Sequence, residues 1–220
     1  MNKKGFIPYP YEYKSLDRVS AEASAFREVM EHRRTIRSFS SDSIPKSVIE
    51  TIIMTASTAP SGAHKQPWTF VAIQDTSLKE EVRKAAEKEE YINYHGRMSE
   101  TWLKDLEPFE TDWHKEFITI APWIIVMFKK SYDITDQGKS KNYYVNESAG
   151  IAAGMLITAI HMAGLVTLTH TPSPMNFLGK ILGRPENEKA FLLLPVGRPV
   201  TGVMVPNLER KPSEEVIVWK

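Results

Sequence analysis

The stretch "APSGAHKQPW" (residues 59–68) separates a segment with the apolar spacing of a helix from a segment with the composition of a strand. Its prolines, glycine and serine are typical of a loop. The small residues Ser61, Gly62 and Ala63, here called the small-residue loop, would let a ligand approach the backbone closely. A simple turn between two elements explains the same composition. The stretch alone therefore predicts either a ligand-binding loop or a plain connection.

Three arginines precede this loop by the length of one short helix, within "HRRTIRSF" (residues 32–39). Cations are favoured near the C-terminal end of a helix, which is one explanation of Arg33, Arg34 and Arg37. Arginine is also the residue best suited to hold a phosphate with two hydrogen bonds. The cluster therefore favours an anionic ligand, to which Arg210 near the other end of the chain could add a fourth guanidinium.

The bulk composition indicates an ordinary globular protein. The chain has 220 residues, of which 42% are hydrophobic and 25% are charged, enough for one domain with a sizeable core. A net charge of +1 gives no reason to expect nucleic acid or an anionic membrane surface as a partner. Cysteine is absent, which excludes disulfides, thiolate metal sites and a cysteine nucleophile, and is compatible with the cytoplasmic location that we expect.

One long uncharged segment raises the question of a membrane. No Asp, Glu, Lys or Arg occurs in residues 148–179, which is long enough to span a bilayer. The segment nevertheless contains glycines, histidines, threonines and two prolines, so we interpret it as a buried helix followed by a buried strand. The N-terminus has no apolar run long enough for a signal peptide, and we expect a soluble protein without a membrane anchor.

The apolar periodicity predicts helices and strands that belong to one α+β domain. Ser20 is a candidate N-cap of the first helix, and Ser77 with Glu80 forms a candidate capping box. Residues 91–120 have no steady period, so we expect a partly helical excursion that could serve as a lid. Helices are expected at residues 20–34, 45–59, 77–90, 146–164 and 176–183, and strands at residues 69–73, 122–128, 165–171 and 191–197.

Two features of the pattern predict a homodimer. The helix expected at residues 146–164 is apolar on nearly every face, so it must be covered all round, by the core or by a partner subunit. The C-terminal stretch "PSEEVIVWK" (residues 212–220) ends in a strand-like run that could pair away from its own chain.

Sequence signatures exclude several kinds of site. The chain has no Walker loop, no G-x-G-x-x-G dinucleotide motif, no paired-histidine metal motif and no G-x-S-x-G elbow. "THTP" offers Thr169, His170 and Thr171 at a strand end, where hydroxyl groups commonly satisfy local backbone groups. What remains is a phosphate-bearing cofactor at a subunit interface, with no metal ion.

Four stretches together resemble the FMN-binding nitroreductase superfamily: "HRRTIRSF", "ASTAPSGAHKQPW", "GLVTLTHTP" and "LLLPVGRP". Within this superfamily, the loop "APSGAHKQPW" and the insert "EEYINY…DWHKE" are similar to those of the iodotyrosine deiodinases and their bacterial homologues. The resemblance covers residues 25–212, nearly the whole chain.

The resemblance implies an α+β, nitroreductase-like three-layer fold in which helices flank a mixed central β-sheet. It implies a single FMN-binding domain over residues 1–220, with a lid insert at about residues 88–118 and a C-terminal extension swapped onto the partner subunit. The protein would be a homodimer that binds FMN at each subunit interface.

The resemblance also assigns residues to the flavin. The arginine cluster would hold the phosphate and the pyrimidine edge, and the small-residue loop would line the flavin from the other subunit. Thr171 would be the catalytic residue, offering its hydroxyl to flavin N5, and Thr169 is the alternative donor. The implied cofactor-binding residues are Arg33, Arg34, Thr35, Arg37, Ser61, Gly62, Thr169, His170, Thr171 and Arg210.

A halotyrosine substrate, which the resemblance implies, has an ammonium group, a carboxylate and an acidic phenol. Glu90 would pair with the ammonium, Lys115 with the carboxylate, and Tyr94 would hydrogen-bond between them. The Ala63 N–H would bind the phenolate oxygen. Glu90 and Tyr94 are four positions apart and would share one face of a helix. Without the resemblance, Glu90 and Lys115 would be interpreted as ordinary solvated charges.

The implied activity is FMN-dependent reductive dehalogenation. It converts 3-iodotyrosine and 3,5-diiodotyrosine into tyrosine and iodide by one-electron steps from reduced FMN. A general NAD(P)H-dependent nitroreductase or quinone reductase is one alternative, and a non-catalytic flavin- or amino-acid-binding protein is another. The sequence has no nicotinamide-binding motif, so the external electron donor, NAD(P)H-linked or other, is not identified by it.

Overall fold

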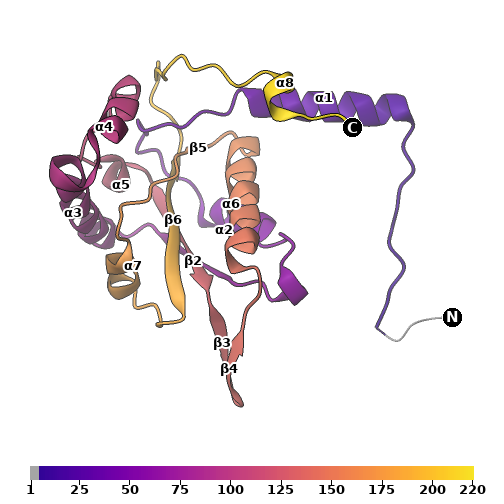
Figure 1. Ribbon diagram of the computed structural model, residues 1–220, viewed down its shortest axis with the longest axis horizontal. Helices are drawn as coiled ribbons and strands as arrows, with labels where there is room; N and C mark the ends of the chain where they lie inside the picture. Colours follow the sequence, from indigo (N-terminus) through magenta and orange to yellow (C-terminus); the bar gives the residue numbers. More distant parts are fainter. Residues whose placement is uncertain (1–4) are drawn as a thin grey trace. The chain divides into compact units, whose positions relative to one another are not determined.

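The computed structural model describes residues 5–220, which form two units (Figure 1). The first unit ends at Arg33 and holds one helix, and the second, Arg34–Lys220, holds every other described element. The second unit is built on a four-stranded sheet in the order β1-β2-β6-β5, whose strands all pair antiparallel. These strands are β1 (Trp68–Ile73), β2 (Trp123–Lys130), β6 (Glu188–Gly197) and β5 (Val166–Thr167).

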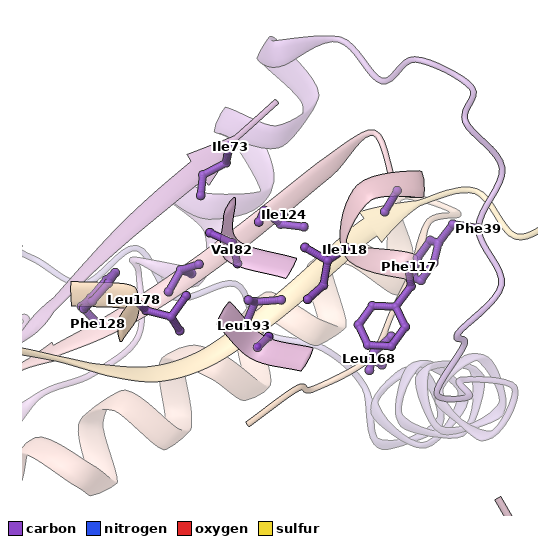
Figure 2. Packing of buried hydrophobic residues seen from close by; sticks show 13 residues of the cluster. Phe39, Ile73, Val82, Phe117, Ile118, Ile124, Phe128, Leu168, Leu178 and Leu193 are labelled. Atoms are coloured by element: carbon purple, nitrogen blue, oxygen red, sulfur yellow. The ribbon is translucent and has the colours of Figure 1, made fainter. Parts of the chain in front are cut away.

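Helices cover both faces of the sheet, which confirms the α+β architecture with flanking helices. One face is covered by α2 (Lys46–Ala56) and α6 (Val145–Met162), the other by α3 (Thr76–Ile92), α5 (Phe117–Ile120) and α7 (Asn176–Ile181). Figure 2 shows side chains from the second set of helices gathered against the sheet.

Strand β2 explains why this sheet has two covered faces. Successive side chains of a strand point to opposite sides, so Ile124 and Val126 join the core under α3 and α7, whereas Ile125 and Met127 join the core under α6. Both sets are fully buried. A strand covered on both faces reads as a continuous apolar run, as this one does in the sequence.

The predicted mixed sheet is antiparallel among its strands. Within residues 5–220, the parallel pairing is a single isolated bridge between Thr35 and Thr167. An isolated antiparallel bridge joins His170 to Leu193, so only two residues of the predicted strand 165–171 form regular strand.

The first helix begins earlier than predicted. Helix α1 spans Leu16–Glu31, and its N-cap is Ser15, whose hydroxyl accepts a hydrogen bond from the Arg18 N–H at 3.4 Å. The assignment of Ser20 as the cap is therefore wrong, because the Ser15 hydroxyl, five residues earlier, already caps the helix.

The capping box predicted for α3 is also wrong. The cap is Asp75, whose carboxylate accepts a hydrogen bond from the Leu78 N–H at 2.7 Å and another from the Ser77 hydroxyl at 2.5 Å. The Ser77 side chain is thus a donor to the cap and does not pair with Glu80. Aspartate is as good a cap as serine, and here it comes two residues earlier.

The chain between α3 and α5 forms short helical pieces, as predicted for residues 91–120. They are the π-helical turn η2 (Asn93–Arg97), α4 (Glu100–Leu106) and the 3-10 turn η3 (Glu107–Phe109). Residues 110–116 are irregular and lead directly into α5. The excursion therefore brings a segment without regular backbone pairing against the end of α3.

A hairpin of two strands and one short helix had no counterpart in the predictions. A polar hairpin, β3 (Tyr132–Thr135) with β4 (Gly138–Lys141), projects beyond β2 (Figure 1). In the C-terminal stretch, the short helix α8 (Ser213–Val216) stands where a strand-like run was expected, and Ile217 onward is extended without a strand partner in this chain.

Candidate functional site

A cavity of ≈ 460 Å³ lies beside β5 and the irregular segment that enters α5. Its volume is within the range of pockets that hold small molecules. Cationic, hydroxyl and apolar side chains share its wall, a mixture that suits a ligand with both rings and negative charge. Among the lining residues are Arg37, Lys115, Phe117, Leu168, Thr169 and His170.

A buried ion pair borders this cavity. The Lys115 Nζ lies 3.3 Å from the Glu90 Oε2, and the two residues are only 6% and 7% exposed. The Lys115 ammonium also donates a hydrogen bond to the backbone carbonyl of Asp112. Burial lowers the pKa of Lys115, although the adjacent Glu90 carboxylate acts in the opposite direction. Glu90 and Lys115 are therefore not solvated surface charges. Burying both charges costs free energy of folding, which favours a functional role for the pair.

Tyr94 joins this pair from η2. Helix α3 ends at Ile92, so Tyr94 lies in the π-helical turn that follows, and not on the α-helix that carries Glu90. The Tyr94 ring centre is 5.4 Å from the Lys115 Nζ, and the phenol oxygen is 2.9 Å from the Thr111 hydroxyl. Burial raises the pKa of Tyr94, so the phenol is neutral and can donate a hydrogen bond. The structure thus brings together Glu90, Tyr94 and Lys115, the three residues predicted to bind the amino-acid end of a substrate.

His170 is a neutral, buried ring in the cavity wall. It is 7% exposed, its ring lies edge-on to Phe117 with the ring centres 5.4 Å apart, and its Nε2 has no hydrogen-bond partner within residues 5–220. Burial lowers the pKa of His170 to about 3, with smaller contributions from the charges of Lys115 and Arg37. The imidazole therefore carries no charge at neutral pH.

This neutral histidine predicts a pH dependence of stability. The pKa of His170 is about 3 in the folded chain against 6.5 for a free side chain, so its full contribution is present above pH 6.5. The contribution is lost as pH falls from 6.5 towards 3, with a slope of at most about 1.4 kcal/mol per pH unit. We expect the unfolding free energy of His170→Thr to fall less steeply over this window than that of the unaltered protein.

The measurement is urea unfolding at intervals from pH 7 to pH 3, with both proteins at the same concentration of added cofactor. The variant loses packing against Phe117, so its absolute stability is not the readout. Parallel curves for the two proteins would contradict a buried neutral His170.

The small-residue loop has an unusual backbone. It contains the 3-10 turn η1 (Gly62–His64), and the φ angles of Ala63, His64 and Gln66 are 51°, 54° and 46°. Residues other than glycine rarely adopt this left-handed backbone conformation, and those that do cluster at functional sites. The Ser61 hydroxyl accepts the Gln66 N–H at 2.9 Å, whereas the Ala63 N–H has no acceptor within residues 5–220. The turn therefore presents a free backbone donor.

Within one chain, the small-residue loop and Arg37 lie at opposite ends of the sheet. Thr35 bridges to Thr167 of β5, at the end where β2 begins, whereas Pro67 accepts the Lys130 N–H at 2.9 Å, at the end where β2 finishes. Strand β2 has 8 residues, which separates its ends by roughly 23 Å. A single chain thus does not assemble both predicted parts of the flavin site in one cavity.

The other predicted cofactor residues lie in several parts of the chain. Arg33 closes the first unit, where its N–H donates to the Met30 carbonyl at 3.2 Å. The cavity wall includes Thr169 and not Thr171, although both threonines are exposed beside His170. Arg34 and Thr35 begin the second unit as exposed residues, and Arg210 is exposed in the C-terminal stretch.

Sequence reasoning missed three residues around Lys115. Thr111 holds the Tyr94 phenol, Asp112 accepts from the Lys115 ammonium, and the Glu87 Oε1 accepts the Lys115 N–H at 2.8 Å. A signal for Glu87 was present, since it precedes Glu90 by three positions and so lies on the same side of α3. The other two lie in irregular chain, which has no periodicity to indicate them.

Within residues 5–220, no group of three or more His, Cys, Asp or Glu side chains is arranged to hold a metal ion. The helices of this described region are each too short or too polar to cross a membrane.

Comparisons of the sequence identify relatives over the whole chain. The model of the nitroreductase family matches residues 30–198. The chain is 58% identical over 217 residues to the iodotyrosine deiodinase of Haliscomenobacter hydrossis, covering 98% of each chain. It is 46% identical over 218 residues to the iodotyrosine deiodinase of Hydra vulgaris, covering 98% of this chain and 80% of the relative. It is 42% identical over 214 residues to iodotyrosine deiodinase 1 of Homo sapiens, covering 96% of this chain and 74% of the relative.

Comparisons of the structure agree. A crystal structure of oxidised iodotyrosine deiodinase bound to FMN and 3-iodo-L-tyrosine superposes with a TM-score of 0.74 at 25% identity, covering 89% of this chain and 98% of that chain. An FMN-bound nitroreductase from Bacteroides fragilis shares the fold, with a TM-score of 0.66 at 19% identity over 88% of this chain and 98% of that chain. The chain therefore belongs to the nitroreductase family and, within it, to the iodotyrosine deiodinases.

Proposed function

We propose that this protein is an FMN-dependent reductive dehalogenase that converts 3-iodotyrosine and 3,5-diiodotyrosine into tyrosine and iodide. The observation that carries the proposal is the buried Glu90–Lys115 pair, of which Lys115 lines the cavity. A carboxylate and an ammonium held at this separation match the opposite charges of an amino acid. A reductase of uncharged nitroaromatics or quinones has no use for such a pair. The named relatives support the same activity.

The residues of the cavity fit FMN. Arg37 is partly buried in the wall, and although burial lowers its pKa, a guanidinium is still charged at neutral pH. An anionic or strongly dipolar ligand would compensate for the hydration that this cation has lost. The residues that would hold FMN are Arg33, Arg34, Thr35, Arg37, Ser61, Gly62, Thr169, His170, Thr171 and Arg210. Bound and reduced, FMN supplies the electrons of the reaction, one at a time.

Each site needs a second copy of the chain. Because the small-residue loop and Arg37 lie at opposite ends of one sheet, we expect the loop of a partner subunit to complete the cavity. Helix α6 supports a homodimer, since its residues Ile151 and Met162 are 47% and 56% exposed in the single chain. Val218 and Trp219 of the C-terminal stretch are more exposed still, which supports the swapped extension.

The lid, at about residues 88–118, would hold the amino-acid end of the substrate. Glu90 and Lys115 neutralise one another in the structure. A zwitterion would replace this pair by two, with its ammonium on Glu90, its carboxylate on Lys115 and the Tyr94 phenol as a further donor. A ligand with only one charge would leave the other buried side chain unpaired, which is costly. Closure of the lid would also exclude water and strengthen these contacts.

The phenol end of the substrate would meet the small-residue loop. The free Ala63 N–H is a backbone donor held in place by the left-handed turn around it. A donor without a nearby acceptor favours an anion over a neutral hydroxyl group. An ortho iodine makes a phenol more acidic, so the site would select halotyrosine over tyrosine by its charge state.

The reaction breaks one carbon–iodine bond and forms one carbon–hydrogen bond. It consumes two electrons and one proton, and the iodine leaves as iodide. The side chains described here bind and orient the ring, and the Thr171 hydroxyl, or that of Thr169, would hydrogen-bond flavin N5. An external donor, NAD(P)H-linked or other, must restore the electrons. The cytoplasmic location remains a prediction.

Anaerobic turnover tests the function. When the FMN-loaded protein is reduced with dithionite and mixed with 3-iodotyrosine, we expect one tyrosine and one iodide for each flavin oxidised. Tyrosine added in place of 3-iodotyrosine should leave the flavin reduced. Chromatography of the products and the flavin absorbance provide the two measurements.

Two outcomes would contradict the proposed function. If no tyrosine forms while NAD(P)H reduces nitroaromatics rapidly through the same flavin, the protein is a general reductase. If the purified chain is colourless and takes up no added FMN, it is not a flavoenzyme.

A further inference from the structure

One face of α3 carries three charged residues, Lys79, Arg83 and Glu87, at intervals of four positions. All three reach the segment that enters and forms α5. The Lys79 ammonium donates to the backbone carbonyls of Thr119 and Ala121 at 3.1 and 2.7 Å, and Arg83 donates to the Thr119 hydroxyl at 3.1 Å. This face of α3 therefore fixes the backbone around α5 by hydrogen bonds.

Glu87 is the member of this row that bonds to Lys115, a residue of the cavity wall. Its Oε1 accepts the backbone N–H of Lys115 at 2.8 Å, and the Arg83 Nε lies 2.7 Å from the same oxygen. Both Arg83 and Glu87 are partly buried, which limits competition from water. A hydrogen bond with an ionised acceptor is shorter and stronger than one between neutral groups.

Lys115 depends on this bond for its position. It stands in irregular chain, where neither a helix nor a strand pairs its N–H. Its side chain must nevertheless reach the substrate carboxylate from a place opposite Glu90. Glu87 and Glu90 both belong to α3, so one rigid helix sets the position of both charges that face the substrate.

We propose that Glu87 is a positioning residue for substrate binding: it fixes the backbone of Lys115 so that the ammonium is preset to receive the substrate carboxylate. The inference rests on the proposed halotyrosine site and does not involve direct contact between Glu87 and the substrate. Removing the bond frees the Lys115 backbone, and binding must then order it again, which weakens binding.

The test compares three FMN-loaded variants with the unaltered protein. We expect Glu87→Ala to weaken 3-iodotyrosine binding by about tenfold, as the loss of one charged hydrogen bond implies. FMN binding should be unchanged. Glu87→Gln keeps an oxygen that can accept the Lys115 N–H and should recover most of the affinity. Glu81→Ala removes an exposed carboxylate from the same helix and should match the unaltered protein.

Flavin fluorescence titrated with 3-iodotyrosine gives the affinities, and hydrogen exchange of the Lys115 amide provides an independent readout. Faster exchange in Glu87→Ala, together with a higher KM at unchanged kcat, supports a positioning role. Equal 3-iodotyrosine affinity in Glu87→Ala and the unaltered protein overturns it, as does an equal loss of FMN and 3-iodotyrosine binding that Gln does not rescue. Failure of the unaltered protein to bind 3-iodotyrosine would instead refute the proposed function.

Discussion

Replacement of Glu90 by Gln should weaken 3-iodotyrosine binding by about 100-fold, because truncating one member of a buried charge pair costs several kcal/mol. The amide cannot balance the substrate ammonium, and it leaves Lys115 as an unpaired buried cation. FMN binding should change little, since neither Glu90 nor Lys115 is among the residues assigned to the flavin. Titration of flavin fluorescence with 3-iodotyrosine, and of the cofactor-free protein with FMN, measures the two effects separately.

Lys115→Met completes a double-mutant cycle with Glu90→Gln. Each single change removes one charge and leaves the other buried, so the double variant should bind 3-iodotyrosine less weakly than two independent losses would give. Glu89→Gln is the matched control, since the Glu89 carboxylate pairs with Arg97 and not with Lys115. Unchanged affinity in Glu90→Gln, or the same loss in Glu89→Gln, would remove the proposed ammonium contact.

The order of elements could be predicted because it depends on local patterns. The apolar run of β2 and the apolar spacing of α2 correctly predict a strand and a helix, although the ends of both elements differ from the predicted ones. The hairpin of β3 and β4 could not, because its strands are short and polar and pair only with one another. Likewise, residues 168–171 have the composition of a strand, yet only His170 finds a bridge partner, Leu193, in the sheet.

The site shows the same division. Glu90, Tyr94 and Lys115 were assigned by resemblance to a family, and the structure places them together. The spacing of Glu87 and Glu90 places both on the same side of α3, but it does not indicate the bond from Glu87 to the Lys115 backbone. That bond joins the helix to irregular chain that only tertiary packing brings close. The left-handed backbone at Ala63 could not be predicted either, since glycine, and not alanine, is the residue that indicates a positive φ.

Replacement of Arg37 by Ala should weaken FMN binding by about 100-fold, which is the loss of one or two hydrogen bonds with a charged partner. Arg37 lines the cavity, and its guanidinium carbon lies 5.9 Å from the centre of the Phe109 ring, a contact that helps to position the side chain. Burial lowers its pKa, so an anionic ligand gains more from this cation than from one in bulk water. Fluorescence titration of cofactor-free protein with FMN measures the effect.

Two further variants distinguish directed hydrogen bonds from Arg37 to FMN from long-range electrostatic attraction. Arg37→Lys keeps the charge without the planar fork, and it should recover only part of the affinity if Arg37 forms two directed hydrogen bonds. Arg198→Ala removes an exposed guanidinium, 4.0 Å from Asp42, and should leave FMN binding unchanged. Full affinity in Arg37→Ala would show that the phosphate and the flavin ring are held elsewhere. Equal losses of FMN affinity in Arg37→Ala and Arg198→Ala would show that Arg37 acts only through its long-range charge. Added salt would then screen its effect.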